Sequence, residues 1–318
     1  MTSYIIRRLL HALVVVILVS ILIFIIIRLL PGDPILMLVN QNSLSTFTPE
    51  QIDALRAEHG LDKPVVIQYL NWAKDIIQGD FGQSIVNRFQ VGEEILARLP
   101  VTLCLGFTGF IIGLIVGPTL GVISAVRRGK WVDNVVTVIA NIGITAPTFW
   151  VGILLIYVFG LKLGWFPIYG YTLPWVDFGM SVKQSVMPVF VIAMFPIAAS
   201  ARQMRASSLE VLQNDYIRTA WAKGLKEKTV IMRHVVKNSL MPVVTLQGQL
   251  LRNIVGGSVV VETVFVIPGM GKMMIDSMLS HDYTVVQGCT LIMIVVVVLS
   301  NLLVDLAYGW IDPRIQYN

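Results

Sequence analysis

The sequence predicts an all-α integral membrane protein with about six transmembrane helices. Of its 318 residues, 55% are hydrophobic and only 14% are charged, whereas roughly a quarter of the residues of an ordinary soluble domain are charged. Long runs without charge recur along the chain, and about 20 mainly apolar residues are needed to cross a bilayer. Because backbone groups in lipid must be hydrogen-bonded internally, we expect these runs to be helices.

Six apolar runs are candidate spans, although the fourth is shorter than the others and the fifth is interrupted by Arg252. They are Leu9–Ile27, Val101–Val126, Asn134–Leu161, Gln184–Ala201, Leu240–Val261 and Tyr283–Val304. We expect the third run to span despite Pro147 inside it. The predicted organisation is a first helix in residues 1–30, an extracytoplasmic cap in 31–99, and a five-helix core in 100–318 that includes a cytoplasmic loop at 202–240.

The first apolar run follows Arg7 and Arg8, a pattern that a cleaved signal peptide also shows. The run is longer than the apolar core of a typical signal peptide. Pro31-Gly32-Asp33-Pro34 follows it where a cleavage site would have small residues. We therefore expect the run to remain as a membrane anchor.

Basic residues predict the orientation, because Lys and Arg accumulate in short cytoplasmic loops. Both termini are predicted to be cytoplasmic, since this orientation places the basic loops inside. The residues concerned are Arg7, Arg8, Arg127, Arg128, Lys130, Arg314 and the stretch Arg202–Lys237. The net charge of +5 therefore reflects membrane orientation. The basic residues are not interleaved with aromatic ones, and we expect no nucleic acid partner.

Residues 31–99 are more polar than the runs beside them and are predicted to form a small cap. Thr48-Pro49-Glu50-Gln51 is typical of a helix start, with proline at the first helical position. A second amphipathic helix is predicted over Val65–Ile77, ending near Gly79. Asp80-Phe81-Gly82 is typical of a turn that leads back towards the membrane.

The longest predicted cytoplasmic loop, residues 202–240, has the periodicity of a folded element. One helical face is formed by Leu209, Leu212, Tyr216 and Ala220. Gly224 is placed to end this helix, and a second helical pattern begins at Lys226. Such a helix-turn-helix projection could lie on anionic lipid or dock onto a cytoplasmic partner, and we favour docking.

Within this loop, Asp215-Tyr216-Ile217-Arg218-Thr219-Ala220-Trp221-Ala222-Lys223-Gly224-Leu225 resembles the cytoplasmic signature of peptide-type ABC importer permeases. That family carries dipeptides, oligopeptides, glutathione and nickel complexes. The resemblance covers nearly the whole chain in order. Its other stretches are Leu30-Pro31-Gly32-Asp33-Pro34, Gly60-Leu61-Asp62-Lys63-Pro64, Gly79-Asp80-Phe81-Gly82-Gln83-Ser84, Asn238-Ser239-Leu240-Met241-Pro242-Val243-Val244, Pro268-Gly269-Met270-Gly271 and Asp312-Pro313-Arg314.

The resemblance implies a multi-subunit importer of the bacterial inner membrane. Its expected partners are a similar second permease, two ATPase subunits and an extracytoplasmic solute-binding protein. ATP and Mg²⁺ would be bound by the ATPases, and this chain would hold no cofactor. In this family the loop helix that ends at the signature glycine inserts into a groove on the ATPase. The resemblance thus implies coupling roles for Asp215, Tyr216, Arg218, Thr219, Ala220, Lys223, Gly224 and Leu225.

Two positions depart from the wider importer pattern. That pattern begins acidic-Ala-Ala, whereas this chain has Arg218-Thr219-Ala220, so the acidic contact of distant relatives does not carry over. The peptide branch resembles the present version. Trp221 stands where Arg is usual, which leaves the contact made there open.

Arg252 is the residue that membrane physics singles out, because a charge at span depth is costly and faces protein or water. It could bind a substrate carboxylate, pair with an acidic group of the partner permease, or mark a misplaced helix boundary. Glu262 is a possible counter-charge, but ten residues of regular helix separate the two backbones by about 15 Å. Both are candidates for the translocation path.

The sequence offers little support for enzymatic chemistry. Gly269-Met270-Gly271-Lys272 lacks the upstream glycine and the following Ser or Thr of a phosphate loop. The four histidines and the two cysteines, Cys104 and Cys289, lack metal-ligand spacing. The remaining alternative is a secondary transporter or channel that works without ATPases. Such a protein should show intramembrane ion sites or an internal repeat, and we find only isolated charges.

Overall fold

The computed structural model describes residues 2–29, 48, 50, 51, 54, 57, 62–252 and 254–311. All regular elements in these ranges are helices, apart from one isolated bridge between Gln83 and Gln90. The chain divides into two compact units, residues 1–100 with 269–318 and residues 101–268.

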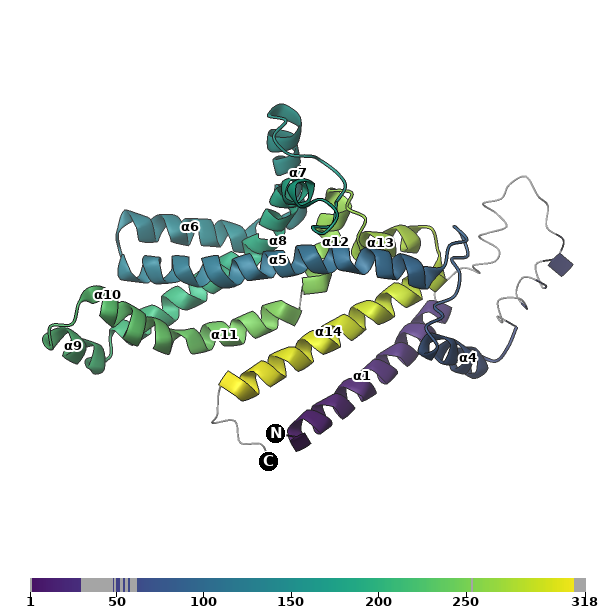
Figure 1. The fold of residues 1–318 in the computed structure, drawn as a ribbon, viewed down its shortest axis with the longest axis horizontal. Coiled ribbons are helices and arrows are strands. Elements are labelled where there is room, and N and C mark those ends of the chain that lie inside the picture. The colour runs from purple at the N-terminus through teal and green to yellow at the C-terminus, as the bar shows by residue number, and fades with distance from the viewer. Residues whose placement is uncertain are drawn as a thin grey trace. The chain divides into compact units, whose positions relative to one another are not determined.

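The first unit is built on two long antiparallel helices, α1 (Thr2–Leu29) and α14 (Tyr283–Ile311), which run side by side in Figure 1. Ile23 and Ile27 of α1 pack with Tyr283 and Val286 of α14. At the other end of the pair, Arg8 and Asp305 form an ion pair of 2.8 Å. The predicted first and last spans are therefore confirmed as helices, with lengths of 28 and 29 residues that exceed the predicted runs by about two turns each.

Helix α4 (Val65–Ile77) has the bounds that the sequence predicts. Gly79, with φ of +86°, follows it, and the Asp80 carboxylate accepts a hydrogen bond of 2.8 Å from the Gly82 amide, which makes the expected turn. The helix packs on α1, where the Phe24 ring lies 5.8 Å from that of Trp72. Aromatic packing on a spanning helix holds this part of the predicted cap.

The predicted helix start at residues 48–51 has the hydrogen bonds of a capping box. The Gln51 side chain accepts from the Thr48 amide at 3.0 Å, and the Gln51 amide donates to the Thr48 hydroxyl at 3.4 Å. Most of the chain from 30 to 61 lies outside the described residues, so the extent of this helix stays a prediction.

The rest of the first unit packs residues 91–100, the start of helix α5 (Val91–Val126), against α13 (Met270–Leu279) and α14. The buried Asp282 carboxylate accepts a hydrogen bond from the Ser84 hydroxyl. This bond ties the segment before α5 to the residue before α14.

In the second unit, residues 101–126 of α5 pack closely against α8 (Phe178–Leu212). A Cβ atom at Gly117 would lie 2.8 Å from the Ile197 carbonyl oxygen, and one at Gly121 would lie 2.7 Å from Met204 Cβ. Glycines four residues apart let two membrane helices approach at backbone distance. The pair forms the centre of this unit.

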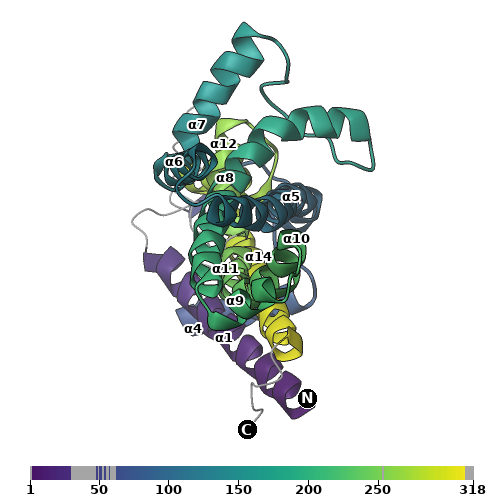
Figure 2. The same cartoon turned by 90° about the vertical axis from the view of Figure 1, so that its left-hand side faces the viewer.

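The third predicted span is wrong as a single straight helix. The structure has α6 (Trp131–Thr145) and then α7 (Thr148–Leu155), which continues as a π-helical segment, Ile156–Lys162. The two halves are bent by 107°. The break lies at Pro147, because the residue before a proline is driven to extended backbone and Ala146 has ψ of 129°. Figure 2 shows α7 projecting away from α6.

The fourth predicted span is a helix, but its predicted end at Ala201 is wrong. Helix α8 runs through Pro188 and Pro196 and continues to Leu212. The fifth predicted span is divided between α11 (Lys237–Arg252) and α12 (Ile254–Val264). The Gln247 side chain of α11 donates a hydrogen bond of 2.6 Å to the Ser200 hydroxyl of α8.

Among the described helices, four are long and apolar enough to cross a membrane. They are Ile5–Leu29, Val91–Val126, Phe178–Leu212 and Tyr283–Leu306. A fifth crossing results if the bent pair of α6 and α7 is one span. The count of six stays a prediction.

Candidate functional site

The candidate site is a helical projection, residues 213–236, between α8 and α11. It consists of the short helix α9 (Asp215–Ala222), the helix α10 (Glu227–Val230), and a π-helical segment, Ile231–Val236, that leads directly into α11. Figure 1 shows α9 and α10 at one end of the second unit, beyond the end of α6. The helix-turn-helix predicted from the sequence is therefore present.

A small apolar core fixes this projection. Ile217 of α9, Val230 of α10 and Val235 of the π-helical segment are fully buried, and they cluster with Ala220 and with Val211 of α8. Burial of these side chains is what orders helices of eight and four residues, which would be unstable in isolation. The orientation of α9 is thus set by the end of α8 and the start of α11.

The predicted helical face is wrong in its register. Leu209 and Leu212 belong to α8, which ends before Gln213, while Tyr216 is exposed and Ala220 is buried on α9. The interruption at residues 213–214 changes the direction of the chain. The sequence periodicity predicted one continuous helical face across residues 209–220, whereas the structure divides these residues between α8 and α9.

Gly224 ends α9 as the sequence predicts. Its amide donates to the Trp221 carbonyl at 2.9 Å, and the Leu225 amide donates to the Ala220 carbonyl at 3.4 Å. These are the two hydrogen bonds of a Schellman motif, and Gly224 has the φ of +77° that this motif requires. A Cβ atom at Gly224 would meet nothing within 4 Å. The glycine is therefore needed for its positive φ and not for close packing, and the space beside it is open.

The outer face of α9 is both polar and aromatic. Asp215, Arg218, Thr219 and Lys223 are exposed. The 3.5 Å pair of Asp215 and Arg218 joins side chains that are 95% and 73% exposed, so it contributes little to stability. Both residues remain available to a partner.

Three large side chains on or beside α9 also face solvent. Tyr216 and Trp221 are each 43% exposed and Leu225 is 40% exposed. Aromatic residues surrounded by polar ones are typical of the centre of a protein interface. The hydroxyl of Tyr216 accepts a hydrogen bond of 3.2 Å from Asn238, which ties this face to α11. Sequence reasoning left the contact of Trp221 open and missed the buried position of Ile217.

An ion pair with a buried carboxylate fastens the part of α8 that precedes the projection. The Asp133 carboxylate, at the start of α6, accepts hydrogen bonds from Arg205 Nε at 2.7 Å and Nη2 at 2.8 Å. It also accepts from the Ser124 hydroxyl at the end of α5 and from the Gly129 amide at 3.0 Å. One carboxylate therefore links α5, α6 and α8 about two helical turns before the end of α8.

Sequence reasoning also missed this pair. The available signal was an acidic residue in the first turn of a helix that follows the basic cluster of Arg127, Arg128 and Lys130. Its partner lies 72 positions later, and no periodicity connects the two.

The two residues proposed for the translocation path lie in different helices. Arg252 is the last residue of α11, and its side chain is outside the described residues. Glu262, on α12, is completely buried and accepts a hydrogen bond of 2.8 Å from the Thr102 hydroxyl of α5. The structure thus places Glu262 in the interior of the second unit, bound to a neighbouring helix.

A mainly apolar cavity of about 280 Å³ lies near this position. Its lining includes Phe110 of α5, Phe195 of α8, and Gly256, Gly257 and Val260 of α12. A Cβ atom at either glycine would meet nothing within 4 Å. Residues of α5, α7, α8, α11 and α12 all line the cavity.

The comparison with known families decides what this architecture is. Residues 117–317 match the family described as binding-protein-dependent transport system inner membrane component. Residues 1–106 match the N-terminal region of the same kind of membrane component. The chain belongs to this family. The resemblance found in the sequence is confirmed, and the projection lies within the matched region.

Individual relatives are similar in sequence to this chain along their whole length. The oligopeptide transport system permease protein AppB of Bacillus subtilis (strain 168) is 39% identical over 320 residues, which cover 100% of both chains. A protein that carries the name peptide transport system permease in Brucella abortus (strain 2308) is 37% identical over 319 residues, again 100% of both. A protein named as a peptide permease in Brucella suis biovar 1 (strain 1330) is 41% identical and covers 99% of each.

Solved structures agree with the fold. A chain of the MetNI methionine ABC transporter in inward-facing conformations has a TM-score of 0.56 at 17% identity and covers 69% of this permease. The match includes 96% of that chain. A chain of an amino acid ABC transporter crystallised with histidines has a TM-score of 0.51 at 16% identity, with 69% and 94% covered. The fold is thus that of chains in ABC transporters.

Proposed function

We propose that this permease is one membrane subunit of an ATP-driven importer for peptides or similarly small polar solutes. A similar second permease, two ATPase subunits and an extracytoplasmic solute-binding protein would complete the importer in the bacterial inner membrane. The permease names of its relatives and the family match support this proposal. ATP and Mg²⁺ would be bound by the ATPase subunits.

The observation that carries the coupling mechanism is the outer face of α9. A partner that contacts Tyr216, Trp221 and Leu225 would push on a helix whose inner face is locked by Ile217 and Ala220. Because the core of the projection joins α9 to the end of α8, a displacement of α9 would be transmitted to that long helix. In this proposal nucleotide-driven closure of the ATPases moves α9, and α8 carries the movement into the membrane.

Such a lever satisfies the energetic requirement for alternating access. Nucleotide can shift the equilibrium between two permease states only through a contact that differs between them. Asp133 and Arg205 fasten α8 to α5 and α6, so these helices would move as a group. The proposed orientation, with both termini cytoplasmic, puts α9 on the ATPase side.

Arg252 and Glu262 stay candidates for different roles in the solute path. The buried bond to Thr102 favours a structural role for Glu262. Arg252, at the end of α11, remains the candidate for contact with a solute carboxylate or with the partner permease. Arg252→Ala in the assembled importer should alter uptake or solute preference, and unchanged uptake of every solute would exclude this role.

The proposal is tested by uptake into vesicles that hold the co-expressed importer, its binding protein and ATP. Labelled dipeptides, glutathione and nickel chelates are offered to native protein and to Gly224→Trp, which fills the open space beside α9. Gly164→Trp is the matched control, because Gly164 also has positive φ, +63°, and also has nothing within 4 Å of a Cβ position. Both variants carry the same type of backbone strain.

We expect the Gly224 variant to assemble with its partners but to lose most ATP-dependent uptake, while the Gly164 variant retains it. Equal uptake by native protein and the Gly224 variant would exclude the coupling role of this face. Uptake that proceeds without ATPases would instead favour a secondary transporter.

A further inference from the structure

A pocket in the first unit has no part in the coupling mechanism. Its volume is about 230 Å³, and residues of α1, α4, the turn after α4 and the first turns of α14 line it. Pockets for drug-sized molecules measure about 300–1,000 Å³, so this one suits a smaller solute. Helix α4 contributes Gln68, Asn71, Trp72 and Asp75, which recur at helical spacing and share one face. The mainly polar face of an amphipathic helix therefore lines the pocket.

The more buried part of the lining holds two hydrogen-bond donors, Arg28 and Gln287. Arg28 donates from Nε to the Gln68 side chain at 2.9 Å, and its guanidinium carbon lies 4.9 Å from the centre of the Phe24 ring. These two contacts orient the guanidinium group. Gln287 is only 5% exposed, and its Nε2 atom has no hydrogen-bond partner in the part of the chain that the structure describes. A buried donor without an acceptor is costly, so an anionic group of a ligand would stabilise both donors.

The exposed part of the lining carries two carboxylates, those of Asp75 and Asp80. One Asp80 oxygen accepts a hydrogen bond from the Gly82 amide at 2.8 Å, which holds this carboxylate in the turn after α4. Among the described residues, neither carboxylate forms an ion pair with Arg28, although all three side chains line one pocket. Opposite charges are thus held apart, and a ligand that carries both signs of charge would bridge them.

This lining selects against ligands of a single charge. A simple anion would be attracted by Arg28 but repelled by Asp75 and Asp80, and a simple cation would meet the reverse. A free peptide carries a carboxylate at one end and an ammonium group at the other. Its two ends therefore match the two parts of the lining.

We propose that this pocket binds a short zwitterionic peptide, with its carboxylate against Arg28 and Gln287 and its ammonium group against Asp75 and Asp80. The choice of a peptide rests on the proposed function, which makes peptides the solutes of this permease. In the proposed orientation the C-terminal end of α1 is extracytoplasmic, so the pocket holds the peptide on the side where solute arrives. The permease then has a solute site of its own, in addition to that of the binding protein.

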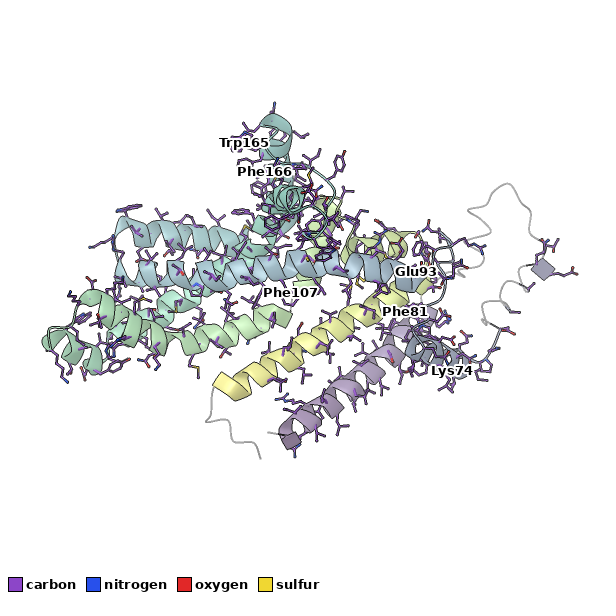
Figure 3. The ribbon with its side chains drawn as sticks, in the orientation of Figure 1. Lys74, Phe81, Glu93, Phe107, Trp165 and Phe166 are labelled. Carbon is purple, nitrogen blue, oxygen red and sulfur yellow. The ribbon has the colours of Figure 1, made fainter. Side chains whose placement is uncertain are left out.

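The experiment measures binding of radiolabelled dialanine to the whole importer, purified in mild detergent without ATP and without the binding protein. Equilibrium dialysis gives the dissociation constant. The pocket variants are Arg28→Gln, Gln287→Leu and Asp75→Asn. Lys74→Gln and Glu93→Gln are the matched controls, because they remove one charge of each sign from exposed residues of the first unit that do not line the pocket (Figure 3).

We expect native protein and both controls to bind dialanine with the same affinity. Arg28→Gln should raise the dissociation constant roughly tenfold, because hydrogen bonds between charged groups are strong. Asp75→Asn should raise it about threefold, because exposed charge pairs are weaker. Gln287→Leu should weaken binding and yet leave the melting temperature of the peptide-free importer unchanged or higher, which loss of a purely structural amide would not do. Asp75 is exposed, so its variant should fold even if Arg28→Gln does not, and an affinity that Asp75→Asn leaves unchanged would overturn the proposal.

A blocked peptide tests which end of the ligand meets the carboxylates. N-acetyl-dialanine lacks the ammonium group and should bind native protein more weakly than dialanine. In the Asp75→Asn/Asp80→Asn double variant the two peptides should bind equally, because both carboxylates that recognise the ammonium group are gone. A loss on acetylation that is as large in the double variant as in native protein would overturn the proposal.

Two comparisons separate a peptide site from its alternatives. Free alanine carries the same two groups on one carbon atom, and tighter binding of alanine than of dialanine would overturn the proposal and assign the pocket to an amino acid. Because no ATP is present, the binding result does not depend on the coupling role of α9. Binding that the pocket variants weaken would support the pocket even if Gly224→Trp left uptake unchanged, and absence of dialanine binding would overturn the pocket whether or not ATP drives uptake.

Discussion

Replacing Asp133 by Ala should destabilise the second unit and uncouple the projection from the membrane helices. The Asp133 side chain is only 4% exposed, and its carboxylate accepts four hydrogen bonds from Ser124, Gly129 and Arg205. The substitution removes all four and leaves the guanidinium group of Arg205 without its anion.

The magnitude follows from the burial of the two partners. Removing one member of a buried ion pair costs about 3–5 kcal/mol. The Arg205 side chain retains 30% exposure, so it can reach water in the variant, and we expect a loss near the lower limit, about 3 kcal/mol. For a unit of this size that corresponds to a fall of roughly 6 °C or more in the melting temperature.

The assay is thermal unfolding of the importer in detergent, followed by ATP-dependent uptake at a temperature where the variant stays folded. Arg205→Ala and the Asp133→Ala/Arg205→Ala double variant complete a double-mutant cycle. The double variant should be more stable than the sum of the two losses predicts, by about 1 kcal/mol or more. Strictly additive losses, or a melting temperature that Asp133→Ala leaves unchanged, would refute the reasoning.

Two further predictions concern packing. Ile217→Ala should remove about 3 kcal/mol from the core of the projection, which limited proteolysis within residues 213–236 should report as a cleavage rate on the order of 100-fold higher. Ile77→Ala, at a side chain that is 86% exposed, is its control and should leave the rate unchanged. Gly117→Ala should lower the melting temperature, because the new Cβ would lie 2.8 Å from the Ile197 carbonyl oxygen of α8. Gly256→Ala, which meets nothing within 4 Å, should leave the melting temperature unchanged or raise it, because alanine is the better helix former. Equal losses at Gly117 and Gly256 would contradict close packing of α5 on α8.

The sequence predicted best those helices whose bounds are set by residues within or next to the helix itself. Helix α4 has the predicted bounds because an amphipathic run ends at a glycine with positive φ. The end of α9 was equally predictable, since Gly224 both supplies that conformation and stops the periodicity. Apolar length likewise identified α1 and α14.

The errors arise where tertiary packing outweighs a local signal. Proline had opposite effects in two helices, for Pro147 separates α6 from α7 whereas Pro188 and Pro196 lie inside α8. A Cβ atom at Gly113 of α5 would lie 2.4 Å from Pro196 Cβ, so α5 supports α8 at that proline. Composition does not distinguish these cases.

The candidate site was predicted in part. The family signature identified the outer face of α9, but the residues that position it, Ile217 and the pair of Asp133 and Arg205, depend on contacts between distant segments. The residues proposed for the translocation path also depend on contacts that the sequence does not reveal. Glu262 was singled out for its charge, and its bond to Thr102, 160 positions away, could not be read from a single sequence.

The central claim, that an ATPase subunit docks on α9, is tested most directly by site-specific photo-crosslinking. In a protein with Cys104 and Cys289 replaced by Ala, Thr219→Cys carries a benzophenone label on the outer face of α9. Val176→Cys, exposed on the second unit between α7 and α8, carries it in the control. We predict that illumination of the assembled importer joins an ATPase subunit to the label at position 219 and not to the label at 176. Absence of an ATPase adduct at 219, or equal adducts at both positions, would contradict the account.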